Sequence, residues 1–433
     1  MISRAVRLLA ALDRARDGLA LDAGLYAVSA AFALVTAVAS TLVPHRAWGA
    51  IAVWAYLGAL LLVGAQLLPG SPRGLSAPSV RMALTWTAWI GAALLPLVVE
   101  AVQRAGGHTG RAQDEVLVVE QMGDRLWHTG TPYLGPEAIA ALPAPDRLLG
   151  YAPYQPGMAV FGLPRAVAGV AWYTDARVWF ALVTAAALGA AARALSGGRP
   201  VGRAGSPVRA VQAATVLPIC SLTLATGGDD LPVLALCLLG LAWCAADRFV
   251  LAGLAVGLAA AGKLFAFPVV AVLAVLAVAT GRGRRFLPGA IGLPVLVLIP
   301  PLLVDGNAFV ENVIRFPLGH GIVRSPAQSP FPGYLIASAL PGGRYVATAL
   351  LVAVAVAIGV RLVRRPPRTA ATAALFCGWG LLAAILLMPT TRFGYLLYPI
   401  ALLVWVPALA VPSASHRGVP VGHLLPPSAT TPG

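Results

Sequence analysis

Charged residues are scarce in this sequence, since Asp, Glu, Lys and Arg together make up only 11% of its 433 residues. Apolar residues account for 59%, and the mean hydropathy is +0.82. A soluble domain of this length would need far more polar surface, because single water-soluble cores stop growing at a smaller size. The composition therefore excludes a soluble protein. It predicts an all-α, polytopic bundle of transmembrane helices with no sizeable soluble domain.

Cysteine is also rare, and its spacing gives no signal. All four cysteines lie inside apolar runs, without a CxxC pattern, so we expect small buried side chains rather than disulfides. The six histidines form no ligand pattern. We therefore expect neither a metal site nor a cofactor.

Arginine supplies nearly all of the positive charge, and the formal net charge is +15. The polar segments between apolar runs alternate in charge: the segments on the side of the N-terminus hold nineteen of the thirty arginines but only four of the sixteen acids. The positive-inside rule makes that side cytoplasmic. We therefore expect a multi-pass plasma-membrane protein with both termini in the cytoplasm, and no nucleic-acid partner.

Twelve apolar runs predict about 10–12 membrane spans. These runs are 24–43, 48–68, 82–100, 178–195, 208–226, 231–246, 249–262, 264–280, 286–304, 344–363, 369–388 and 394–412. The seventh and eighth runs are short for full spans. They could form a tilted pair, a broken helix or one re-entrant unit.

The same pattern predicts the domain organisation. We expect a cytoplasmic amphipathic segment at 1–22, one transmembrane domain at 23–412 and a disordered cytoplasmic tail at 413–433. Two outer segments within the domain are long, 101–177 after the third span and 305–343. Loops of that length are usually functional.

Acids are concentrated at the outer ends of the runs. The longest outer segment contains an acidic cluster that begins with Asp114 and Glu115. Adjacent residues of a helix point about 100° apart, so one of the two could act as a general base while the other holds the geometry. The alternative is that both are solvated loop acids. A second acidic pair, Asp229 and Asp230, follows two glycines in a short outer turn. That pair could bind a sugar hydroxyl or a cation, or simply end two helices.

Aromatic residues accompany these acids. Tyr133 ends the string Gly-Thr-Pro-Tyr, and Tyr151 and Tyr154 belong to Tyr-Ala-Pro-Tyr. Such strings predict rigid interfacial turns, for which an aromatic belt is the structural alternative.

The single lysine of the chain, Lys263, interrupts an apolar stretch near the predicted outer face. A charge there is costly unless it is paired or functional, and a compact ammonium suits a lipid phosphate. A lysine reaching from a helix end to the interface is the alternative. Arg392, in the outer turn that also holds Tyr395, could clamp a phosphate as well.

The order of these motifs resembles the membrane glycosyltransferases of the C superfamily, which take a sugar from a polyprenyl-phosphate carrier. The closest resemblance, over about 82–412, is to the actinobacterial polyprenyl-phosphate-mannose-dependent branch, family 87. The motifs that carry it are Asp114, Gly130 to Tyr133, Tyr151 to Pro153, Gly227 to Asp230 and Gly262 to Pro268. The chain departs from the branch in two places, because the acid is a doublet and the glycine turn ends in Asp-Asp instead of the usual Gly-Gln.

The resemblance implies an inverting transfer of a sugar, mannose in that branch, to an envelope glycolipid or glycan at the outer face. Asp114, or alternatively Glu115, would be the base, and Lys263 and Arg392 would hold the donor phosphate. The residues implied in substrate binding are Tyr133, Tyr151, Tyr154, Asp229, Asp230 and Tyr395. A secondary transporter and a non-catalytic envelope-assembly protein are the alternative functions.

Overall fold

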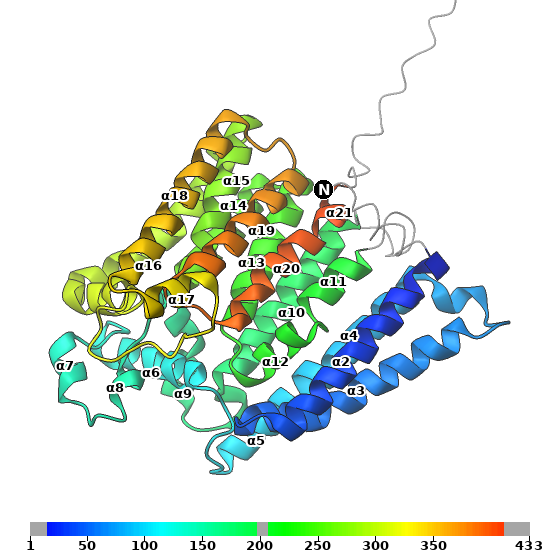
Figure 1. Cartoon of the computed structure of the whole chain (residues 1–433), viewed down its shortest axis with the longest axis horizontal. Coiled ribbons are helices and arrows are strands. Elements are labelled where there is room, and N and C mark those ends of the chain that lie inside the picture. The colour runs from blue at the N-terminus through cyan, green and yellow to red at the C-terminus, as the bar shows by residue number, and fades with distance from the viewer. Residues whose placement is uncertain (1–14, 197–206, 411–433) are drawn as a thin grey trace, which may run out of the picture.

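The computed structural model describes residues 15–196 and 207–410, which form a bundle of helices (Figure 1). No β-strand occurs within these two ranges. The all-α prediction is therefore confirmed. Most of the predicted amphipathic segment at 1–22 and the whole predicted tail at 413–433 lie outside the described residues.

Every predicted apolar run is helical. The helices are α2 (Leu19–Ala39), α3 (Val43–Leu67), α4 (Pro78–Trp89), α5 (Leu95–Ala105), α10 (Ala176–Leu195), α11 (Val208–Ala214), α12 (Pro218–Thr226), α13 (Asp230–Ala245), α14 (Phe249–Gly262), α15 (Phe267–Ala279), α16 (Gly283–Phe309), α18 (Gly343–Arg364), α19 (Ala370–Leu387), α20 (Leu397–Val404) and α21 (Val406–Leu409). The π-helical turn η3 (Ile90–Leu94) joins α4 to α5 into one long helix.

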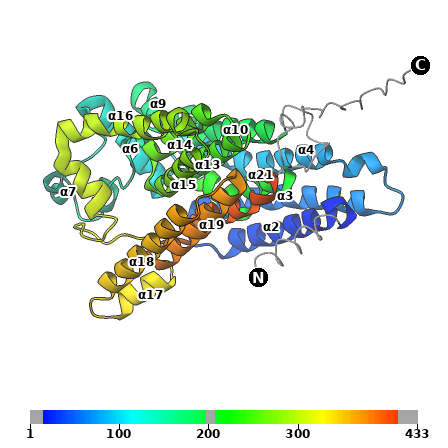
Figure 2. The same cartoon turned by 90° about the horizontal axis from the view of Figure 1, so that it is seen from above.

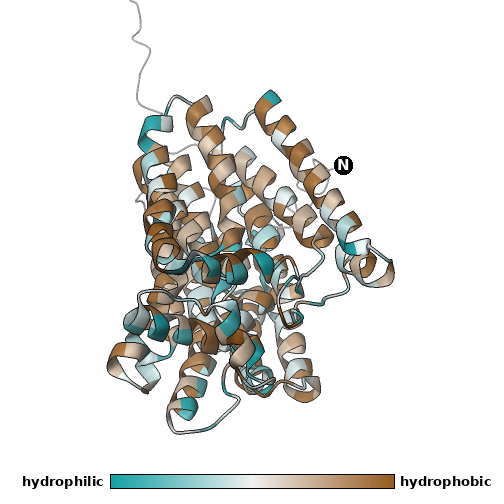
Figure 3. Ribbon diagram, turned by 90° about the vertical axis from the view of Figure 1, so that its left-hand side faces the viewer, coloured by the Kyte–Doolittle hydropathy of each residue, from teal (hydrophilic) through white to brown (hydrophobic). Residues whose placement is uncertain are grey.

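Seven of the described helices are long and apolar enough to cross a membrane, or eight if the pair α11–α12, bent by 43°, counts as one span. The helices α13, α14 and α15 and the α20–α21 pair are apolar but shorter. The predicted total of 10–12 crossings therefore stays a prediction, although each predicted segment exists. Figure 3 shows that apolar residues dominate the long helices, as a bilayer requires.

The predicted outer segment 101–177 folds into short helices that gather at one end of the bundle (Figure 1). They are α6 (Asp114–Thr129), α7 (Pro136–Ala141), α8 (Arg147–Gly150), η4 (Pro156–Phe161), α9 (Leu163–Ala168) and η5 (Trp172–Thr174). Two glycines let α6 pack directly on the η4–α9 corner. A Cβ on Gly162 would lie 2.2 Å from the carbonyl oxygen of Val119, and one on Gly123 would lie 2.2 Å from the carbonyl carbon of Gly162.

The second predicted outer segment, 305–343, begins at a kink in the helix. α16 bends at Asp305, whose φ and ψ are −152° and 88°, and continues into the π-helical turn η7 (Val310–Arg315). The Asp305 carboxylate accepts a hydrogen bond from Ala308 N at 2.9 Å, so this polar residue caps a new helical turn and does not begin a loop. The short helix α17 (Pro332–Ala339) follows, and Figure 2 shows it beside α18, far from the α2–α3 pair.

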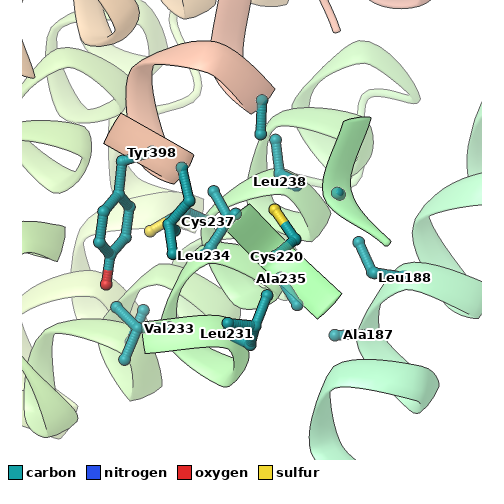
Figure 4. Close-up of a cluster of buried hydrophobic side chains, with 14 of the residues drawn as sticks. Ala187, Leu188, Cys220, Leu231, Val233, Leu234, Ala235, Cys237, Leu238 and Tyr398 are labelled. Carbon is teal, nitrogen blue, oxygen red and sulfur yellow. The ribbon is translucent and has the colours of Figure 1, made fainter. Parts of the chain in front are cut away.

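A tightly packed apolar core supports the end of α13 that carries the acidic turn. Leu231, Leu234 and Leu238 of α13 lie between Leu188 of α10 and Tyr398 of α20 (Figure 4). All five side chains are almost completely buried. Because such cores are densely packed, the first turn of α13 and the Tyr398 ring hold fixed positions relative to each other.

Candidate active site

A cavity of about 820 Å³ lies where α6, the α12–α13 turn, the α14–α15 turn and the turn at 390–395 meet. Its wall includes nine of the ten residues that the sequence singled out for the site. These are Asp114, Glu115, Tyr151, Tyr154, Asp229, Asp230, Lys263, Arg392 and Tyr395. Three separate sequence signals, the acid doublet, the acidic turn and the lone lysine, thus converge on one space.

Lys263 forms ion pairs that the sequence did not predict. Its Nζ lies 2.6 Å from Asp229 Oδ2 and 2.5 Å from Asp230 Oδ1. Asp230 Oδ1 also accepts a hydrogen bond from the Tyr398 hydroxyl at 2.8 Å. The two carboxylates offset the cost of burying the ammonium and favour its charged form. Among the described residues these two partners engage two of its three N–H groups, and the third can reach a ligand.

The break between α14 and α15 places this lysine. α14 ends at Gly262, Lys263 is extended, and the 3₁₀ turn η6 (Leu264–Ala266) leads into α15. The carbonyl of Gly262, which the break leaves without a helical partner, accepts a hydrogen bond from Gln155 N at 3.2 Å. The rings of Tyr154 and Tyr395 lie 5.3 and 5.7 Å from Nζ, within range of cation–π attraction. Asp247, which precedes α14, forms an ion pair with Arg282, which follows α15, so the two helices run antiparallel with Lys263 at their turn. The broken helix is therefore not observed, and the tilted pair and the re-entrant unit stay predictions.

The acid doublet is divided between two environments. Asp114 begins α6 and is exposed to the cavity, and no hydrogen bond or ion pair to its carboxylate occurs among the described residues. Glu115 is mostly buried and forms an ion pair with Arg392. One acid is therefore unpaired among the described residues, while the other ties α6 to the turn at 390–395.

The turn at 390–395 is also tied to the segment before α17. Ser329 N donates to Thr391 O at 2.9 Å, and Thr391 N donates to Ala327 O at 3.0 Å, which forms an isolated β-bridge between Gln328 and Thr391. Arg392 is thereby fixed from both sides, by a carboxylate and by backbone bonds on its neighbour.

The two aromatic strings have different positions. The ring of Tyr151 stacks on Phe316 at 4.1 Å, and its hydroxyl donates to Glu311 Oε1 at 2.9 Å, so it is a pinned wall residue. Tyr133 lies behind the wall and does not line the cavity. Its hydroxyl donates to the carbonyl of Tyr154 at 2.8 Å. Tyr133 thus holds the backbone of Tyr154 from behind, and its implied role in substrate binding stays a prediction.

A buried ion network lies behind the acids, and the sequence analysis missed it. Arg177, with no exposed surface, forms a bidentate pair with Asp175 at 2.9 Å. Its Nη1 also donates to the carbonyls of Arg111 at 2.8 Å and Ala225 at 3.0 Å. One guanidinium therefore holds both the segment that leads to Asp114 and the helix end that leads to Asp229. No signal in the sequence marks it, because Arg177 lies just before the predicted apolar run 178–195.

The network extends to Arg104, which bonds both Asp175 Oδ2 at 2.9 Å and Glu120 Oε2 at 2.6 Å. Burial would raise the pKa of Asp175, but Arg177 and Arg104 more than offset it and hold this pKa at about 2. Asp175 is therefore a carboxylate at any working pH, and it keeps Arg177 in place.

The described residues contain no group of three or more His, Cys, Asp or Glu side chains arranged to hold a metal ion. What the cavity offers is one unpaired carboxylate, two ion-paired cations with free N–H groups, and aromatic faces. That set suits a ligand with a hydroxyl and a phosphate.

The family model of glycosyltransferase family 87 matches residues 151–389, more than half of the chain. The chain belongs to glycosyltransferase family 87. No curated protein and no solved structure matches it. The matched residues include Tyr151, Tyr154 and the Lys263–Asp229–Asp230 triad. Asp114, Glu115 and Arg392 lie outside the match, so their assignment depends on the geometry of the cavity.

The role of Arg177 in this family-87 enzyme can be tested by changing the shape of its cation. We expect Arg177→Lys to lower kcat about 10- to 100-fold while the donor KM changes little, because a single ammonium cannot hold both carbonyls and the acids shift relative to each other. The measurement is steady-state sugar transfer with donor and acceptor varied separately.

Arg104→Lys is the matched control for Arg177→Lys. It disturbs the same ion network but contacts neither carbonyl. Equal loss of kcat in both variants, accompanied by equal loss of thermal stability, would reduce Arg177 to a structural residue.

Proposed function

We propose that this protein is an inverting glycosyltransferase that moves a sugar, with mannose the expected one, from a polyprenyl-phosphate donor to an envelope glycolipid or glycan. The observation that carries the proposal is the shared cavity, in which the unpaired carboxylate of Asp114 accompanies the Lys263–Asp229–Asp230 triad. Membership of family 87 supports the reaction class.

The reaction needs one base. Asp114 takes the proton of an acceptor hydroxyl, and that oxygen attacks the anomeric carbon as the bond from this carbon to the phosphate oxygen breaks. The polyprenyl phosphate leaves with the electron pair, and the configuration at the anomeric carbon inverts. A direct displacement forms no covalent enzyme intermediate, so no second carboxylate is required as a nucleophile.

The cations act mainly on the leaving group. The donor phosphodiester carries one negative charge, and the departing phosphate monoester develops a second. Lys263 has one N–H free, and Arg392 keeps the donors that Glu115 does not use. Contacts that strengthen as this charge develops stabilise the transition state more than the bound donor. The carboxylate partners keep both cations charged and oriented.

The proposed orientation places the cavity at the outer membrane face. α6 to α9 and α17 lie at one end of the bundle, whereas the α18–α19 turn, with Arg364, Arg365 and Arg368, lies at the other (Figure 1). The positive-inside rule assigns the arginine-rich end to the cytoplasm of the plasma membrane. A cavity at one end argues against a secondary transporter, whose site would lie near the midplane.

The deciding experiment uses the purified protein in nanodiscs with radiolabelled polyprenyl-phosphate mannose and a glycolipid extract as acceptor. We expect label to enter the acceptor fraction, with the opposite anomeric configuration to that of the donor. Absence of transfer from mannose, glucose and arabinose donors alike, or sugar movement into liposomes without transfer, would overturn the proposal.

A further inference from the structure

The hairpin formed by α2 and α3 lies before the residues that the family model matches, yet it forms one wall of the cavity. Its contribution consists of six residues: Phe32, Val35, Thr36, Ala39, Ser40 and His45. The proposed function gives this wall no role.

The wall is apolar along α2 and polar where the hairpin turns. Phe32 and Val35 are 45% and 62% exposed, although both are large apolar side chains. At the turn, His45 Nε2 lies 2.5 Å from the side-chain amide nitrogen of Gln113, the residue directly before Asp114. Gln113 is itself fixed, because its backbone N–H donates to Thr226 O at 2.9 Å. A molecule bound on this wall would place its polar end beside Asp114 and its apolar end along α2.

The hairpin and the lysine occupy different walls. α2 and α3 pack on α12, and α3 also packs on η3 and α5. Lys263 instead lies among α13, α14, η6 and η4, and its partners come from the first turn of α13. The end of α12 and the start of α6 line the same cavity.

An inverting displacement requires this kind of separation. The attacking oxygen and the departing phosphate must lie on opposite sides of the anomeric carbon. If the phosphate lies at Lys263, the acceptor approaches from the wall that faces away from it. Phe32, Val35 and Ala39 line the cavity on this side, so an apolar chain of the acceptor would bury against them.

We propose that the α2–α3 hairpin is the acceptor wall, and that it selects an amphiphilic acceptor: a sugar hydroxyl placed between Asp114 and the His45–Gln113 pair, with an alkyl or acyl chain along Phe32, Val35 and Ala39. This inference rests on the proposed transfer reaction and assigns one of its two substrates. A soluble glycan without a lipid chain would gain nothing from this wall.

The test compares two acceptors with the same sugar, methyl α-mannoside and octyl α-mannoside, on the full protein in nanodiscs. Ala39→Trp fills the wall, and Val38→Trp is the matched control, because Val38 is the neighbouring residue on α2 and does not line the cavity. We expect Ala39→Trp to raise the KM of octyl mannoside at least tenfold and to leave the methyl mannoside and donor KM values within twofold. Val38→Trp should leave all three unchanged.

Comparing variants with one acceptor at a time removes the effect of alkyl partitioning into the bilayer, which all variants share. His45→Ala should raise KM for both mannosides, since the polar end of the wall contacts the sugar of each.

Three outcomes would overturn the assignment while leaving the transfer reaction intact. The first is a raised donor KM in Ala39→Trp, which would assign the wall to the prenyl chain of the donor. The second is an equal rise in the KM of both mannosides in that variant. The third is that no KM changes in that variant. If the wild-type protein transferred sugar to neither mannoside nor to the glycolipid extract, the proposed function itself would fail.

Discussion

Asp114→Asn is expected to lower kcat about 10³-fold while leaving the protein folded and inserted, because it removes the only proton acceptor assigned to the reaction. Asparagine has nearly the same shape as aspartate, and Asp114 has no ion pair among the described residues that the change would break. The thermal unfolding temperature should therefore match that of the wild type. The measurement is initial rate at saturating donor and acceptor.

Glu115→Gln is the control for this prediction, since it alters the neighbouring acid and releases Arg392. We expect it to raise the donor KM and to retain most of kcat. Turnover of Asp114→Asn within a few-fold of the wild type would refute the base assignment. A larger loss of kcat in Glu115→Gln than in Asp114→Asn would transfer the role to Glu115.

Lys263→Ala is expected to lower kcat/KM for the donor by about 100-fold and to affect the acceptor KM far less. A charge-assisted hydrogen bond to phosphate that is removed from water contributes roughly enough binding free energy to account for a loss of this size in kcat/KM. The substitution also leaves Asp229 and Asp230 side by side without their counter-ion. Breaking a buried pair in this way costs about 3–5 kcal/mol of stability, so a low yield of folded protein is part of the expected result.

A second variant separates the two effects. Combining Lys263→Met with Asp229→Asn and Asp230→Asn removes every charge of the triad, so stability should recover while donor binding does not. An unchanged donor KM in Lys263→Ala would count against a phosphate contact. Recovery of transfer in the neutral triple variant would show that the triad is only structural.

The positions of the spans could be predicted from sequence, because a bilayer imposes the same requirement on every helix that crosses it. All twelve apolar runs are helices, although four of them are short. The ninth run was predicted to end at 304, and the regular helix is interrupted there, because Asp305 has non-helical φ and ψ and caps a new helical turn.

The site could be predicted as a set of residues but not as a set of contacts. Lys263 and the acid pair were each identified because charge is rare in this chain, yet their ion pairs join residues 33 and 34 positions apart. Contacts between residues this far apart in the sequence depend on how the helices pack, and a hydropathy profile does not contain that information. Arg177 and His45 were missed for the same reason, because the role of each depends on hydrogen bonds to distant parts of the chain.

The short helices around the cavity have a consequence for the surrounding lipid. At about 1.5 Å per residue, the 14 residues of α14 and the 13 of α15, which both expose apolar side chains, extend only about 21 and 20 Å, against a hydrocarbon thickness of about 30 Å. A bilayer meets such hydrophobic mismatch by thinning locally. Headgroups beside these helices would then sit deeper than elsewhere, so a carrier lipid could present its phosphate at the depth of the lysine without leaving its leaflet.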